Sequence, residues 1–103
     1  MGDRGSPGAP VSDEICTATL EIVNRLGLHA RAAVLLVQEA KRFDAEVTVS
    51  KDGQTVNGLS IMGIMMLAAE KGTTIAVETK GPQARAALDA ISALVASRFN
   101  EPE

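Results

Sequence analysis

The stretch AEVTVSKDGQTVN, residues 45–57, decides the fold of this 103-residue chain. Its first half alternates apolar and polar side chains, which is typical of a half-buried β-strand. Three residues are expected to face inward and three outward: Ala45, Val47 and Val49 against Glu46, Thr48 and Ser50. The pair Asp52-Gly53 favours a two-residue hairpin turn. The segment from Gln54 to Asn57 is therefore predicted to be a short third strand at the edge of an antiparallel sheet.

Two other segments, 16–22 and 73–79, show the same alternation and predict two further strands. Their expected inward residues are Cys16, Ala18, Leu20 and Ile22 in the first segment, and Ile75 and Val77 in the second.

Three segments show the spacing of amphipathic helices. The first covers residues 30–43. The second is short and covers residues 61–69. Ser60 is its predicted N-cap, and Gly72 is predicted to take the left-handed position where the helix terminates. The third is opened by Pro82. The residues expected to be buried are Ala33, Leu36, Val37 and Ala40 in the first, Ile64, Leu67 and Ala68 in the second, and Ala84, Ala87, Leu88, Ile91, Leu94 and Val95 in the third.

The order of these elements is β-α-β-β-α-β-α. A four-stranded antiparallel sheet with three helices on one face buries every apolar stripe, so we predict the α+β class and an open-faced sandwich. Residues 1–13 are rich in Gly, Pro, Ser and charge, and we expect them to form a flexible tail before one domain at 14–103.

Composition excludes several classes of function. The net charge is −3 and the only aromatic residues are two phenylalanines, so we expect no nucleic-acid partner. One cysteine and one histidine exclude an internal disulfide and make a poor metal site, so no metal and no cofactor are expected. No apolar run is long enough to span a membrane, and no signal-peptide core is present at the amino terminus. These features predict a cytoplasmic protein.

The single histidine, His29, lies where a loop-like sequence gives way to the first predicted helix. The first amides of a helix lack partners and carry positive potential, so such an end binds anions. A phosphoryl group on His29 would meet these amides, and Arg31 could add a charge-assisted hydrogen bond. An ordinary surface or capping histidine is the alternative interpretation of the same position.

Two motifs resemble those of a known family. LGLHAR, residues 26–31, is similar to the active-site motif of the histidine-containing phosphocarrier protein, HPr, of the phosphoenolpyruvate-dependent phosphotransferase system. GQTVNGLSIMGI, residues 53–64, resembles the segment around that family's regulatory serine. The resemblance extends from about Cys16 to Phe99 and implies that residues 14–103 form an HPr-like phosphocarrier domain.

The resemblance implies a phosphoryl relay. His29 would accept phosphate on Nδ1 from enzyme I and pass it to IIA-type acceptor domains, and Arg31 would steady the phosphate. Ser60 would be modified by an HPr kinase/phosphorylase in those branches of the family that have one. The family usually has proline where this chain has Ala32, which is expected to loosen the site slightly while the helix survives.

The second predicted helix is almost entirely apolar and cannot bury every side. Its methionines either fill gaps in the core or form a docking surface for successive partners. The resemblance favours a docking surface made of Ala30, Ile61, Met62 and Met65. We expect the carrier to be a monomer. A regulatory docking module controlled through Ser60 is the alternative function, and the sugar-uptake and nitrogen-related branches remain equally open. A free-standing enzyme is not expected, because no base is found to partner the histidine.

Overall fold

The Asp52-Gly53 turn joins strand β3 (Glu46–Lys51) to strand β4 (Gln54–Asn57) in the computed structural model, which describes residues 14–103. Lys51 pairs with Gln54, so the loop has two residues. Both have left-handed φ angles, 51° at Asp52 and 83° at Gly53, as a type I′ hairpin requires. The predicted hairpin is confirmed. The tail predicted at 1–13 lies outside the described residues.

The sheet has the strand order β2-β5-β3-β4, with every neighbouring pair antiparallel. Strand β2 (Ile15–Glu21) pairs along its whole length with β5 (Thr74–Lys80), which also pairs with β3. Strand β4 lies at an edge, as predicted.

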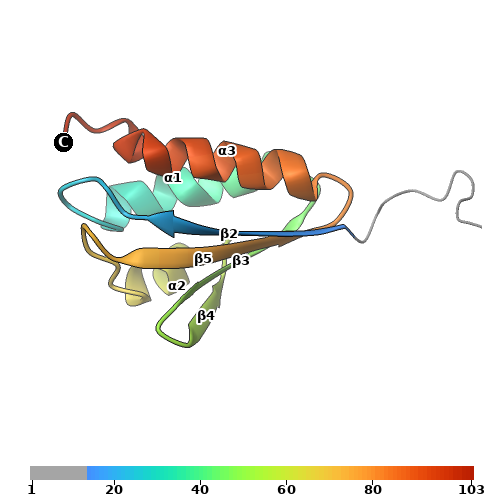
Figure 1. Ribbon diagram of the computed structural model, residues 1–103, viewed down its shortest axis with the longest axis horizontal. Coiled ribbons are helices and arrows are strands. Elements are labelled where there is room, and N and C mark those ends of the chain that lie inside the picture. The colour runs from blue at the N-terminus through green and yellow to red at the C-terminus, as the bar shows by residue number, and fades with distance from the viewer. Residues whose placement is uncertain (1–13) are drawn as a thin grey trace, which may run out of the picture.

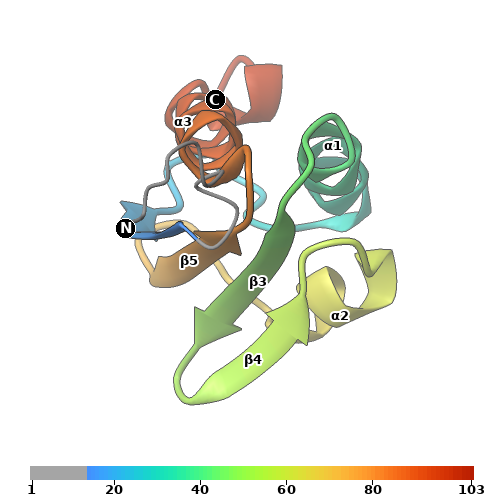
Figure 2. The same ribbon diagram turned by 90° about the vertical axis from the view of Figure 1, so that its right-hand side faces the viewer.

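Helices α1 (Ala30–Ala40) and α3 (Ala84–Ala96) lie side by side over one face of the sheet (Figures 1 and 2). The short helix α2 (Ile61–Met66) lies next to α1 and β4. A single 3-10 turn, η1 (Arg98–Asn100), follows α3. The open-faced sandwich and its element order are confirmed.

Three predicted helix boundaries were wrong. Helix α1 ends at Ala40 rather than at residue 43, because the chain turns there to enter β3. Helix α2 ends at Met66, and the left-handed position that follows it is taken by Ala68, at φ 52°, rather than by Gly72. Helix α3 begins at Ala84, since Gln83 is held outside the helix by two hydrogen bonds with the backbone of Asp44.

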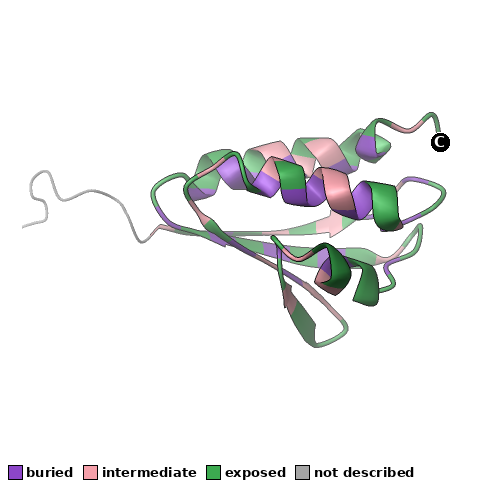
Figure 3. Cartoon of the chain, turned by 180° about the vertical axis from the view of Figure 1, so that it is seen from behind, coloured by how far each residue is buried: buried purple, intermediate pink, exposed green. Residues whose placement is uncertain are grey.

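The core lies between the sheet and the helices, where the buried residues of α1, α3 and the strands meet (Figure 3). Nearly all of the predicted inward residues are buried or partly buried there. In α2 the prediction was wrong for Ala68, which is exposed while Ala69 is buried, because the helix ends before it. Within residues 14–103, none of the helices is long and apolar enough to cross a membrane.

Candidate functional site

His29 occupies the N-cap of α1, the position that the sequence predicted. Its backbone is extended, and its carbonyl oxygen accepts a hydrogen bond of 2.9 Å from the amide of Ala33. Its side chain makes no capping hydrogen bond, so the first amides of the helix remain available to an anion. The macrodipole of α1 adds positive potential at the same point.

The loop before His29 is anchored to the segment that follows α2. Gly27 has a φ of 69°, and the amide of the buried Leu28 donates to the carbonyl oxygen of Ala69 at 2.9 Å. This bond ties the histidine loop to the segment that follows α2, next to the start of α1.

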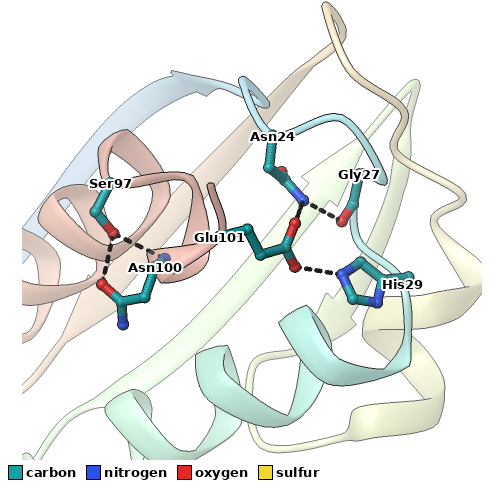
Figure 4. A network of polar contacts seen from close by, with 6 residues as sticks. All are labelled: Asn24, Gly27, His29, Ser97, Asn100 and Glu101. Atoms are coloured by element: carbon teal, nitrogen blue, oxygen red, sulfur yellow. Dashed lines mark hydrogen bonds and ion pairs between the residues drawn. The ribbon is translucent and has the colours of Figure 1, made fainter. Parts of the chain in front are cut away.

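A carboxylate from the far end of the chain contacts the histidine (Figure 4). Glu101 Oε2 lies 2.5 Å from His29 Nε2, although 72 residues separate them. Asn24 Nδ2 donates to Glu101 Oε1 at 3.1 Å and to the carbonyl oxygen of Gly27 at 2.8 Å. The sequence analysis expected no such partner for the histidine, and it missed both Glu101 and Asn24.

The contact determines which nitrogen of His29 carries the proton. Burial acts to raise the pKa of the Glu101 carboxyl, but hydrogen bonds from His29 and Asn24, with the nearby charge of Arg31, hold that pKa below its ordinary value of 4.5. Glu101 is thus an anion at neutral pH and can only accept. We therefore assign the proton of the neutral ring to Nε2, which leaves a lone pair on Nδ1. Nδ1 lies on the side of the ring away from Glu101 (Figure 4).

An open hollow of about 200 Å³ surrounds His29, and its walls carry charges of both signs. Arg25 Nε lies 3.2 Å from Glu103 Oε1, and the Arg25 amide donates to the Glu103 carbonyl oxygen at 3.0 Å. Arg31 is exposed and makes no ion pair with any residue from 14 to 103. The remaining lining residues are Leu26, Glu101 and Pro102. Arg31 is therefore the cationic wall of the hollow that has no carboxylate partner within residues 14–103.

Ser60 is the N-cap of α2, as predicted, and its Oγ accepts from the amide of Gly63 at 3.0 Å. Beyond it, the methionines do not fill the core. Four large apolar side chains of the helix are exposed, namely Ile61, Met62, Met65 and Met66. The first three were predicted from the sequence to form a docking surface, and Met66 was not. Ala30 is also exposed at the start of α1. We call the four side chains of α2 the apolar patch.

Comparison with known proteins identifies relatives of this chain. Residues 16–97 match the family model described as "PTS HPr component phosphorylation site". The chain is 51% identical to the phosphocarrier protein HPr of Cupriavidus necator over 82 residues, which is 80% of this chain and 92% of that protein. It is 48% identical to the phosphocarrier protein NPr of Shewanella violacea over 80 residues, which is 78% of this chain and 88% of that protein. The crystal structure of HPr from Thermoanaerobacter tengcongensis superposes with a TM-score of 0.82 at 40% identity, covering 85% of this chain and 99% of that one.

Proposed function

The chain belongs to the HPr family of the phosphotransferase system, and we propose that it carries a phosphoryl group on Nδ1 of His29. The observation that carries this proposal is the position of the ring. His29 stands at the start of α1 without capping it, so the helix amides can receive the phosphate, and Arg31 stands at the same end with its guanidinium unpaired within residues 14–103.

In the transfer step, the lone pair of Nδ1 attacks phosphorus, and a P–N bond forms. In this proposal the donor, enzyme I, carries the phosphate on a histidine of its own; that P–N bond breaks, and its electron pair stays on the donor's ring. The transferred group carries negative charge that the first amides of α1 and the Arg31 guanidinium can stabilise. No cofactor enters this step.

The proposed partners are enzyme I as the donor and IIA-type domains as acceptors, met in turn by a monomeric carrier in the cytoplasm. Each must approach a ring that is 27% exposed, so contact has to come from the surface around it. Ala30 and the apolar patch of α2 supply exposed apolar area on the two helices that contact each other. Flexible methionines suit a surface that several different partners use.

We propose that Ser60 regulates this docking when it is phosphorylated, by an HPr kinase/phosphorylase where one is present. A phosphate on Ser60 would add up to two negative charges at the start of α2, directly before Ile61 and Met62. The charge would be compatible with the helix N-terminus but would have to be desolvated when a partner covers the patch.

Incubation with enzyme I and labelled phosphoenolpyruvate tests the proposal. The wild-type protein should gain one phosphate that is labile in acid and stable in base, as expected for a P–N bond. His29→Ala should gain none; its melting temperature should fall somewhat, because Glu101 loses its contact with the ring, so the variant is first shown to be folded. Labelling that persists in this variant, or no labelling of the wild type by any enzyme I of the same organism, would overturn the assignment.

A further inference from the structure

The geometry around His29 points to Glu101 as a positioning residue. We propose that its carboxylate, oriented by Asn24, keeps the proton of the His29 ring on Nε2 and so leaves the lone pair on Nδ1 in both halves of the relay. This inference rests on the proposed function, since it assigns a task to residues around the same histidine.

The contact has the properties of a built site. The Glu101 side chain is only 8% exposed, and its two oxygens are used separately, one by His29 Nε2 and one by Asn24 Nδ2. Asn24 is fully buried and also holds the carbonyl oxygen of Gly27, so the ring, its carboxylate and its loop are linked by three hydrogen bonds. The fully buried Phe99, two residues before Glu101, anchors the segment that delivers the carboxylate.

A simple tether for the end of the chain does not account for this arrangement. The tether is already present in the exposed pair Arg25–Glu103, whose side chains are 67% and 72% exposed. Asn24, in contrast, is fully buried, and its amide nitrogen donates both to Glu101 Oε1 and to the Gly27 carbonyl oxygen, on the loop that carries His29. A tether needs no such buried donor to orient the carboxylate toward the ring.

The chemistry needs the Nε2 proton in both directions. When His29 accepts phosphate, only a ring with its lone pair on Nδ1 can form the new bond. When it donates, the P–N bond breaks and its electron pair returns to Nδ1. Because Nε2 keeps its proton throughout, the leaving group is a neutral imidazole rather than an imidazolate anion. Glu101 never takes the proton; it accepts the same hydrogen bond in both states.

Nitrogen NMR of histidine-labelled protein tests the inference directly, because the chain has one histidine and so gives one pair of ring signals. The variants are Glu101→Gln, which keeps the volume but can present a donor to Nε2, and Glu101→Ala. Glu103→Gln is the matched control, since Glu103 lines the same hollow but pairs with Arg25. Spectra are recorded at neutral to mildly alkaline pH, beside melting temperatures and the rate of phosphorylation by enzyme I at varied carrier concentration.

The wild type and Glu103→Gln should show a protonated Nε2 and a bare Nδ1. Glu101→Gln should shift the ring toward the Nδ1-protonated form, and Glu101→Ala should mix the two forms. The maximal rate of phosphorylation should fall about tenfold in both Glu101 variants, as expected for one charge-assisted hydrogen bond, while the half-saturating concentration changes little. The charges of Arg25, Arg31 and Glu103 face the same ring and are unchanged in these two variants.

Unchanged ring signals in both Glu101 variants would overturn the inference, whatever the rates. A rate loss equal to that of Glu103→Gln would also overturn it, because the end of the chain would then act only as a tether. If the wild type accepted no phosphate while the Glu101 variants showed the predicted ring shifts, only the proposed function would be refuted. The positioning of the ring by Glu101 would stand.

Discussion

Gly27 and Ala69 approach so closely that a Cβ added to the glycine would lie 2.4 Å from the alanine carbonyl oxygen. That oxygen also accepts the amide of Leu28, the residue before the histidine. Glycine is therefore required at this position for two reasons: its backbone has a left-handed φ of 69°, and the Ala69 carbonyl oxygen leaves no room for a Cβ.

Gly27→Ala should lower the free energy of unfolding by about 2–3 kcal/mol, because the left-handed strain and the backbone contact add. Phosphorylation of His29 should slow as its loop moves. Gly53→Ala is the control, since Gly53 has a φ of 83° with nothing within 4 Å of its added Cβ. It should cost only about 1 kcal/mol, the conformational part. Equal losses in urea denaturation would show that the contact with Ala69 does not matter.

Arg31→Ala should slow phosphorylation of His29 about tenfold or more, the value of one charge-assisted hydrogen bond. The fold should be unaffected, because the Arg31 side chain is exposed. Lys41→Ala and Arg42→Ala, at the other end of α1, are the controls. If rapid-quench measurements gave all three variants the same loss, general electrostatic attraction of the partner would explain the data better than a specific phosphate contact.

Met62→Ala should weaken the binding of enzyme I without changing the melting temperature, because this side chain is 69% exposed and lies in the apolar patch. A loss of about tenfold in affinity is expected if Met62 is one of the energetically important contacts. Ile15→Ala matches it, being 57% exposed but at the first residue of β2, whereas the His29 loop follows the last residue of that strand. Titration calorimetry that found equal effects for both variants would contradict docking through α2.

Ser60→Asp should preserve the melting temperature, since aspartate also caps a helix, and should reduce phosphorylation by enzyme I. Ser60→Ala loses the hydrogen bond to the Gly63 amide and should cost about 1 kcal/mol of stability while leaving transfer almost unchanged. The two variants thus separate the effect of added negative charge on transfer from the effect of a lost N-cap on stability. Slower transfer together with a falling melting temperature in Ser60→Asp would indicate unfolding of α2 instead.

The thermal stability of the protein should depend on pH through the ionisation of Glu101. Because the pKa of its carboxyl is held below the ordinary value of 4.5, the contact stabilises the fold above that value and is lost as pH falls through the lowered pKa. The wild type should therefore be more stable than Glu101→Gln at pH 6, and the difference should shrink progressively below pH 4.5. Thermal melts of both proteins over this range test the sign; a constant difference would contradict it.

Local patterns in the sequence were sufficient for most of the fold. The alternation around Val47 and Val49 and the Asp-Gly pair determined a hairpin, because both features act between neighbouring residues. The N-caps at His29 and Ser60 were predicted for the same reason. The ends of the helices were not, because they depend on contacts such as the one between Gln83 and Asp44, which are distant in sequence.

The sequence by itself determined the position of His29 at a helix start, with Arg31 beside it, since both follow from local chain geometry. Only the tertiary structure decided what touches the ring. Glu101 reaches His29 because α3 runs back across the sheet and the buried Phe99 fixes its end, and no local pattern encodes that contact. A hydrogen bond between residues 72 positions apart depends on the packing of the whole core, which is why a single sequence did not reveal it.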